Sequence, residues 1–447
     1  MRSSLALLFL SLLSSTNAYR KTTVRKTSHG PTGYVVDFIY RHNSTTQPSS
    51  VIVGGINYLS DALHASVSKS SGYSPYTWKP GQFSYQNFAT SDVNANVSYA
   101  GFNMTYNAGE KLWELSLPLP SQTYQYAFYP DCKTIWPNCA GVVDEGNLPI
   151  EARRGDQVDS VVEVPANRRY SNLDYTYQFP VKESARGEIA FYEYPSPGST
   201  YPSPNVHSTG VYLPAGYHDN PGKVYPVLYL SHGGGGNDSD WFNVARAHQI
   251  MDHLILEKYL EPTIVVTPNF YDLGFTTQQY ATNRSQEGFD VEGYNAFYNA
   301  VAANYKFHLL PFIESKFRAA STQSRRAFAG LSLGGGLTAT MLFNATETFG
   351  TYNVMSNIPF PVQGGPIYQK PGLKDVGIFL SAGIYDIAFQ NSMNSGARLD
   401  AAGLSGYQNY YFPEGGHQWA SWQAILWTWG KGNWWDIKPA GGGPLSS

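Results

Sequence analysis

The stretch RRAFAGLSLGGG, residues 325–336, decides the fold of this chain. Its first half is mostly apolar, which favours a short buried strand, and Gly330 to Gly334 fits the pattern G-x-S-x-G. In this pattern the serine, here Ser332, occupies a sharp turn between a strand and a helix, and the flanking glycines let neighbouring backbone approach without a Cβ clash. The pentapeptide alone is a weak signal. Its place between a predicted strand and a predicted helix favours a nucleophile turn over a glycine-rich turn without catalytic importance.

A second glycine-rich segment follows the predicted strand YPVLYL at 225–230. His232 is followed by four glycines, Gly233 to Gly236. Consecutive glycines after a strand let backbone N–H groups point at a developing negative charge, which favours an oxyanion loop. A phosphate loop is the competing interpretation, but neither G-x-x-x-x-G-K-[ST] nor G-x-G-x-x-G with a following acidic residue is completed here. An ordinary flexible turn is another interpretation that the sequence does not exclude.

A serine hydroxyl is a poor nucleophile at neutral pH, so it needs a base, and the base needs an orienting acid. His417, in PEGGHQWASW, is the only histidine after Ser332, and it follows the predicted strand at 408–414. The acid should follow the preceding strand, GIFLSAG at 377–383, and Asp386 lies three residues beyond its end. Less suitably placed are Asp375, Asp400 and Glu414.

The chain changes character midway. Residues 19–183 contain short runs rich in Val, Ile, Tyr, Phe and Thr, bounded by Gly, Pro, Asn and Ser, which predicts an all-β, immunoglobulin-like sandwich. In residues 184–447 strands alternate with helical patterns, which predicts an α/β domain with a mostly parallel sheet. The strands expected there, besides those named above, are at 186–194, 263–268, 325–330 and 351–356, and the helices at 243–259, 295–317 and 420–432.

The 447 residues carry 30 Lys and Arg against 33 Asp and Glu, a net charge of −3. Without a basic surplus, a general nucleic-acid binder or a protein held electrostatically on a membrane is excluded. Only 14% of the residues are charged, against roughly 25% in an average soluble protein. Aromatic residues make up 15%, and 34 of them are tyrosines.

Residues 1–18, MRSSLALLFLSLLSSTNA, have the pattern of a secretory signal peptide, so we expect a secreted, extracellular protein without an integral membrane segment. In an oxidising compartment the two cysteines, Cys132 and Cys139, are expected to form a local disulfide; a zinc site is disfavoured because further ligands at suitable spacing are missing. Six N-x-S/T sequons offer glycosylation sites. Five are candidates, Asn43, Asn96, Asn103, Asn283 and Asn344, and the sixth, Asn237, is disfavoured because it adjoins the glycine loop.

The ordered motifs resemble an esterase family of secreted α/β-hydrolases that contains feruloyl esterases, acetylxylan esterases, enterochelin-type siderophore esterases and mycolyltransferases. The nearest likeness is to the feruloyl esterase modules of bacterial xylanases. It covers about 230 residues, and the ordered set of motifs is more specific than any single one. The matching segments are VYLPAGY (211–217), the run with HGGGG and DSDW (226–241), LEPTIVVTPN (260–269), LLPFIESKFR (309–318), AGLSLGGG (329–336), Gly383 to Asp386, and GGHQWASW (415–422).

The resemblance implies Ser332 as nucleophile, His417 as general base and then acid, and Asp386 as the residue that orients it. The oxyanion donors would be the backbone N–H groups of Gly234 and Leu333. The implied activity is release of feruloyl or related acyl groups from plant cell-wall polysaccharide, without a cofactor or metal. Alternatives are an acetylxylan or siderophore esterase, an acyltransferase, and a non-catalytic carbohydrate-binding protein.

Tryptophans flank the catalytic segments and are candidates for an aromatic wall around a phenolic acyl group. Core packing beneath the loops is the competing interpretation for each of them. They are Trp241, Trp419 and Trp422. Oligomeric state is not indicated by the sequence.

Overall fold

The computed structural model describes residues 20–28, 32–42, 45–55, 102–119, 121–133, 139–151, 159–169, 173–273, 291–357, 360, 366–384, 386–413, 415–437 and 440, with the backbone alone for 291–296. The predicted signal peptide at 1–18 lies outside the described residues. The same holds for the sequons at Asn43, Asn96 and Asn283.

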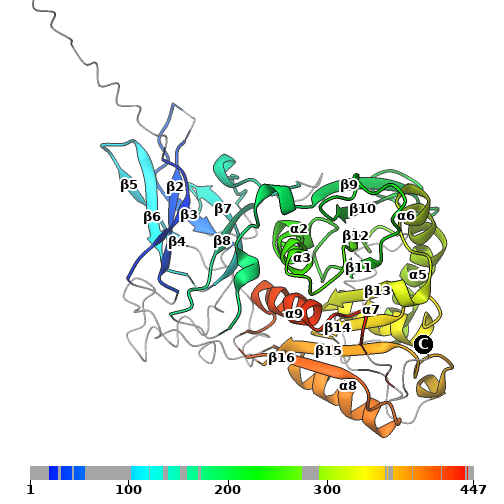
Figure 1. Ribbon diagram of the computed structural model, residues 1–447. Helices are drawn as coiled ribbons and strands as arrows, with labels where there is room; N and C mark the ends of the chain where they lie inside the picture. The colour runs from blue at the N-terminus through cyan, green and yellow to red at the C-terminus, as the bar shows by residue number, and fades with distance from the viewer. Residues whose placement is uncertain are drawn as a thin grey trace, which may run out of the picture.

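An eight-stranded mixed sheet forms the centre of the C-terminal part (Figure 1). Its order is β16-β15-β14-β13-β11-β12-β10-β9. The six strands from β16 to β12 are parallel, and β10 pairs antiparallel with both β12 and β9. Strand bounds are β9 Glu188–Pro195, β10 Val206–Leu213, β11 Val227–Ser231, β12 Ile264–Pro268, β13 Arg326–Leu331, β14 Thr351–Met355, β15 Gly377–Gly383 and β16 Gln408–Phe412.

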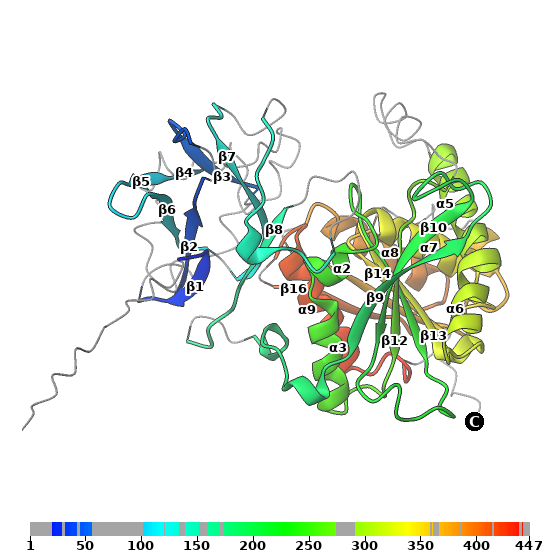
Figure 2. The same ribbon diagram turned by 90° about the horizontal axis from the view of Figure 1, so that it is seen from above.

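Helices cover both faces of this sheet, as Figure 2 shows from above. Apolar side chains of α5, α6, α7 and α8 form one core layer, and those of α2, α3 and α9 form the other. Strands β11 to β15 are buried almost throughout because both faces are covered, which is why they read as nearly continuous apolar runs. The helices are α2 Asp240–Asn243, α3 Ala247–Leu256, α5 Val291–Asn304, α6 Leu310–Lys316, α7 Leu333–Asn344, α8 Phe389–Ala401 and α9 Trp419–Lys431, with a π-helical turn, Tyr305–Leu309, between α5 and α6.

The N-terminal part is rich in sheet. Two four-stranded antiparallel sheets, β1-β2-β6-β5 and β4-β3-β7-β8, share an apolar core in which the rings of Phe38 and Tyr126 lie 5.0 Å apart. The disulfide between Cys132 and Cys139 follows β7. An immunoglobulin-like topology stays a prediction. The strands are β1 Thr23–Lys26, β2 Tyr34–Tyr40, β3 Val51–Gly54, β4 Phe102–Asn103, β5 Thr105–Asn107, β6 Leu112–Leu117, β7 Gln122–Pro130 and β8 Ser160–Val164.

The two parts contact each other through α2, α3 and α9 (Figure 1). Asn243 exchanges two hydrogen bonds with the backbone of Glu151, at 2.8 and 3.1 Å. Gln423 of α9 donates to Thr123 of β7 at 3.2 Å. The N-terminal part therefore lies against the helix that begins just after His417. Among the described residues, no helix has both the length and the apolar character to cross a membrane.

Candidate active site

Four neighbouring parallel strands end at the same edge of the large sheet. Ser332 follows β13, Ser356 follows β14, Asp386 follows β15, and His417 follows β16. Carboxyl ends of adjacent parallel strands meet in space, so residues spread over 86 positions of sequence converge here. This is the edge of an open α/β sheet where ligands are usually bound.

Ser332 stands on a sharp turn between β13 and α7, with φ 55° and ψ −115°. Positive φ is uncommon for a non-glycine residue and is often found at active sites. The turn also requires glycine beside it. A Cβ on Gly334 would lie 2.3 Å from the carbonyl oxygen of His232, and one on Gly330 would lie 2.4 Å from the carbonyl oxygen of Gly334. Glycine at these two positions is therefore required by the close packing of the backbone.

His417 lies between the other two predicted catalytic residues. Its Nε2 is 3.0 Å from Ser332 Oγ, and its Nδ1 is 2.8 Å from Asp386 Oδ1. Because an ionised carboxylate only accepts hydrogen bonds, Nδ1 carries the proton and Nε2 is left to accept the serine hydroxyl. The Asp386 side chain is fully buried, whereas 24% of the His417 side chain is exposed. The histidine side chain is therefore partly accessible from outside, whereas the carboxylate that orients it is not.

Two further groups hold Asp386. Ser356 Oγ donates to Oδ2 at 2.6 Å, and the backbone N–H of Ala388 donates to Oδ1 at 2.8 Å. Trp422 Nε1 in turn donates to Ser356 Oγ at 2.9 Å. Burial acts to raise the pKa of Asp386, but the positive charge of protonated His417 and these hydrogen bonds outweigh it, so the pKa lies below its ordinary value. The carboxylate stays ionised when His417 takes up a proton.

The predicted oxyanion donors belong to adjacent backbone segments. A Cβ on Gly234 would lie 2.9 Å from Leu333 Cδ1, and one on Gly233 would lie 3.3 Å from Ser332 Cβ. Leu333 is the first residue of α7, where the backbone N–H has no partner within the helix and the helix dipole favours negative charge. The glycine loop therefore lies directly beside the serine turn, as an oxyanion site requires.

His232 and Tyr271 hold this loop in place. His232 is buried and stacks on Phe270 with ring centroids 4.0 Å apart, and its Nδ1 is 2.8 Å from the carbonyl oxygen of Gly233. Burial lowers the pKa of His232 to about 4, so the ring is neutral at pH 7. Tyr271 Oη accepts a hydrogen bond of 2.9 Å from the N–H of Gly235, which has φ +74°.

The sequence carried different signals for these supporting residues. Ser356 and Tyr271 belong to no motif, so their supporting roles could not be predicted from the sequence. His232 stood out in the sequence only because four glycines follow it, and its role in holding the loop was not predicted.

The three tryptophans differ in their exposure. Trp241 is completely buried, and its Nε1 donates to the carbonyl oxygen of Ser231 at 2.9 Å. Trp241 therefore cannot contribute to the predicted aromatic wall around the substrate, because its ring is buried in the core beneath the end of β11. Trp422 packs edge-on against His417 at 5.1 Å. Trp419 is half-buried and lies edge-on to both other tryptophans, so it stays a candidate for contact with substrate.

Two predicted sequons and one disfavoured sequon fall in the described residues. Asn103, in β4, is exposed. Asn344, the last residue of α7, is also exposed, and its amide Nδ2 donates to Asn299 Oδ1 at 3.3 Å. Asn237 Oδ1 accepts from the backbone N–H and the hydroxyl of Ser239 at 2.8 and 2.7 Å. Its side chain thus organises the loop beside the serine.

The sequence of the chain also matches a known protein family. Residues 207–429 match the family model described as "Putative esterase", and the matched range contains all three strand-end residues of the Ser-His-Asp arrangement. The chain belongs to this esterase family. Within the described ranges, no group of three or more His, Cys, Asp or Glu side chains is gathered as metal ligands.

Curated relatives of this esterase chain include two large xylanases. Endo-1,4-beta-xylanase Y of Acetivibrio thermocellus is 33% identical over 31% of this chain and 12% of the relative. The endo-1,4-beta-xylanase/feruloyl esterase of Xylanibacter ruminicola is 28% identical over 48% of this chain and 26% of the relative. The chain thus matches about a quarter or less of each relative's length.

A solved esterase structure shares the fold, and a second solved structure is similar over a shorter range. An enterochelin esterase from Shigella flexneri, 14% identical, has a TM-score of 0.52 and covers 94% of this chain and 96% of that one. The feruloyl esterase module from Clostridium thermocellum, 22% identical, has a TM-score of 0.45 and covers 60% of this chain and 94% of that one. The first match extends over both parts of the chain, whereas the second covers little more than half of it.

Proposed function

We propose that this chain is a serine carboxylic ester hydrolase that works through an acyl-enzyme. The observation that carries the proposal is the position of His417, within hydrogen-bond distance of both Ser332 Oγ and Asp386 Oδ1. Nucleophile, base and orienting acid are therefore arranged for proton transfer before substrate arrives. Membership of the esterase family supports the same chemistry.

In this proposal Ser332 Oγ attacks the ester carbonyl while its proton moves to His417 Nε2. The negative oxygen of the tetrahedral intermediate lies at the N–H groups of Gly234 and Leu333, each worth roughly 3 kcal/mol of barrier. The intermediate collapses, and the alcohol leaves with the proton from His417. Water then gives its proton to the same nitrogen, attacks the acyl-serine, and releases the acid with Ser332 regenerated.

The proposed substrates are feruloyl or related esters of plant cell-wall polysaccharide. The names of the two xylanase relatives support this choice, and one of them carries a feruloyl esterase name. An ester-linked siderophore is the second candidate, because the enterochelin esterase shares the arrangement of both parts of the chain. Acetylxylan is a third ester that the same machinery accommodates.

We also propose that the protein is exported and glycosylated. The signal-like residues 1–18, the sequons at Asn103 and Asn344, and the Cys132–Cys139 disulfide support an oxidising compartment. The N-terminal part, proposed as an immunoglobulin-like sandwich, would brace α2 and α9 beside the catalytic residues through Asn243 and Gln423.

A substrate panel on the purified protein tests the function. Methyl ferulate, acetylated xylan and a ferric siderophore ester are compared, and a phosphonate probe is used to label the nucleophile. Ser332→Ala should lower turnover by about 10⁴-fold or more and abolish labelling, while thermal unfolding is unchanged. Ser321→Ala, at an exposed position before β13, is the matched control. An unlabelled but folded wild-type protein would instead indicate a non-catalytic binding protein.

A further inference from the structure

Trp419 is the first residue of α9 and lies two residues after His417. Gln418, which stands between them, has extended backbone with φ −154° and ψ 162°. Along extended backbone the side chains of residues i and i+2 lie on the same side, so the indole of Trp419 lies on the side from which His417 reaches Ser332. The indole is therefore a neighbour of the catalytic base, and its surface is only partly buried.

Two buried tryptophans hold the Trp419 ring. It lies edge-on to Trp241 at 5.6 Å and edge-on to Trp422 at 5.1 Å. Trp422 in turn packs edge-on against the His417 ring at 5.1 Å, so at most two such steps separate the rings of Trp419 and His417. Since Trp241 and Trp422 are 0% and 6% exposed, Trp419 is the member of this cluster that a ligand can reach.

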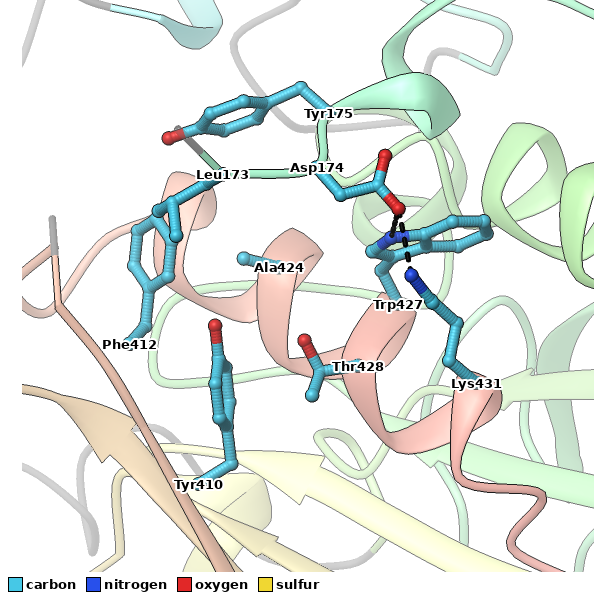
Figure 3. Close-up of a pocket in the computed structure, with 9 residues that line it drawn as sticks. All are labelled: Leu173, Asp174, Tyr175, Tyr410, Phe412, Ala424, Trp427, Thr428 and Lys431. Atoms are coloured by element: carbon cyan, nitrogen blue, oxygen red, sulfur yellow. Dashed lines mark hydrogen bonds and ion pairs between the residues drawn. The ribbon is translucent and has the colours of Figure 1, made fainter. Parts of the chain in front are cut away.

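Contacts with other parts of the chain hold α9 along its length. Near the middle of the helix, Gln423 Nε2 donates at 3.4 and 3.1 Å to the two backbone carbonyl oxygens that follow α2. In the second half, Trp427 Nε1 and Lys431 Nζ both donate to Asp174 Oδ2, at 3.1 and 2.9 Å (Figure 3). The helix therefore presents Trp419 in a fixed position, so a ligand meets a surface that is ordered before it binds.

The chemistry of ester hydrolysis decides which half of a substrate faces Trp419. In the proposed mechanism the carbonyl oxygen of the ester lies at the N–H groups of Gly234 and Leu333. The alcohol leaves by taking a proton from His417 Nε2, so its oxygen must lie within hydrogen-bond distance of that nitrogen. An aromatic ring beside His417 therefore meets the alcohol half of the ester, whereas the acyl chain leaves the tetrahedral carbon in a different direction.

From these features we propose that Trp419 is a specificity-determining residue that packs on a sugar ring in the alcohol half of the substrate. The inference rests on the proposed ester hydrolysis and identifies its alcohol as a carbohydrate. A sugar ring has apolar C–H groups on its faces, which complement the flat apolar surface of an indole.

This role differs from the aromatic wall around a phenolic acyl group that the sequence predicted. The aromatic residue is the expected one, but the position of its ring beside the general base assigns it to the leaving alcohol. Trp419 therefore acts on the choice of the alcohol, and the residues that contact the acyl group lie elsewhere.

Two feruloyl esters with the same acyl group and different alcohols test the proposal: methyl ferulate and feruloylated arabinofuranose. Trp419→Ala should lower kcat/KM for the arabinose ester about threefold to tenfold, mainly through a higher KM, because the aromatic face is removed. For methyl ferulate the change should stay within about twofold. Trp419→Phe keeps an aromatic face, so it should show a smaller loss that is again confined to the arabinose ester.

Gln418→Ala is the matched control. Gln418 is also partly buried and adjoins His417, but the extended backbone directs its side chain away from the side shared by His417 and Trp419. This variant should keep the wild-type kcat/KM for both esters. Thermal unfolding verifies that each variant is folded.

A loss that is confined to the arabinose ester and to the Trp419 variants supports the proposal. An equal loss for both esters, a larger loss for methyl ferulate, or no loss for either overturns it, and so does the same selective loss in Gln418→Ala. Failure of the proposed function gives a different result. In that case the wild type hydrolyses neither ester and the phosphonate probe does not label Ser332, and the assignment of Trp419 is overturned as well.

Discussion

Ser356 stabilises the ionised form of Asp386. It adopts φ 50°, its backbone N–H donates to Ser381 O at 2.7 Å, and its hydroxyl donates to Asp386 Oδ2 while accepting from Trp422. This chain of hydrogen bonds runs from the first turn of α9 to the catalytic carboxylate. A hydrogen bond to a charged group is worth about 1.5–3 kcal/mol, so this contact matters for a carboxylate without solvent access.

Replacing Ser356 tests this support. Ser356→Ala should lower kcat about tenfold to a hundredfold, because the carboxylate loses one of the groups that orient it. The same loss raises the pKa of Asp386 towards its ordinary value, so the part of the acid limb that reflects protonation of this carboxylate, at the most acidic end of the pH–rate profile, should move to higher pH. Steady-state kinetics extended to about pH 3 measures both effects. A variant with reduced kcat and an unmoved acid limb would show that Ser356 has only a packing role.

Tyr271 supports the oxyanion loop in the same way that Ser356 supports Asp386, through one hydrogen bond. Tyr271→Phe removes the acceptor of the Gly235 N–H and should lower kcat about tenfold with little change in KM, because the loop acts mainly on the transition state. Kinetics with methyl ferulate measures the two constants separately. An equal rise in KM with constant kcat would contradict this role.

At the scale of elements, β13, the serine turn and α7 form one tightly packed unit. The first helical turn of α7 approaches β11 and β14 so closely that Gly334 and Gly335 touch neighbouring carbonyl oxygens. Cβ atoms on these residues would lie 2.3 Å from the oxygen of His232 and 2.4 Å from that of Met355. Backbone is the obstacle in both cases, so no side-chain rotation relieves the clash.

Gly334→Ala should therefore destabilise the protein by about 3 kcal/mol or more, with loss of activity. Gly222→Ala is the control, since a Cβ there meets nothing within 4 Å. Urea unfolding followed by tryptophan fluorescence compares the two variants. If both variants unfold at the urea concentration at which the wild type unfolds, the close contact between α7 and the backbone of the sheet is contradicted.

The elements also show where sequence patterns are informative. Strands β11 to β15 were predicted within two residues of their bounds, because strands buried on both faces are continuous apolar runs. Helix α8 was not predicted. It has only four buried residues among its 13, and serine, asparagine and glycine weaken its intrinsic helix propensity, so packing against the sheet decides its structure.

At the scale of the whole molecule, the contact between Glu163 and Arg246 is one of the ion pairs that join the two parts. Glu163 of β8 lies 3.8 Å from Arg246 Nε and 3.4 Å from Gln249 Nε2. Burial raises the pKa of Glu163 to about 7, despite the opposing charge of Arg246. Since the folded pKa exceeds the model value of 4.5, the resulting stabilisation is present below pH 4.5 and is lost as the pH rises through 7.

Glu163→Gln, which mimics the protonated carboxyl group, should remove this dependence. Relative to wild type, the variant should gain stability between pH 5 and pH 8, by an amount on the order of 3 kcal/mol. Guanidinium unfolding at both pH values measures the difference, and Glu145→Gln, at an exposed position of the same part of the chain as Glu163, is the control. A pH-independent difference would contradict the raised pKa.

The sequence by itself determined the α/β architecture and the order Ser332, Asp386, His417. Both depend on local physics: apolar runs specify buried strands, and glycines permit a turn that other residues forbid. Tertiary structure decided which residues support them. Ser356 meets Asp386 only because β14 pairs with β15, Trp241 is buried only because α2 folds beneath β11, and Asp174 meets Lys431 across 257 residues of sequence. Such contacts depend on how strands and helices pack, which no local pattern records.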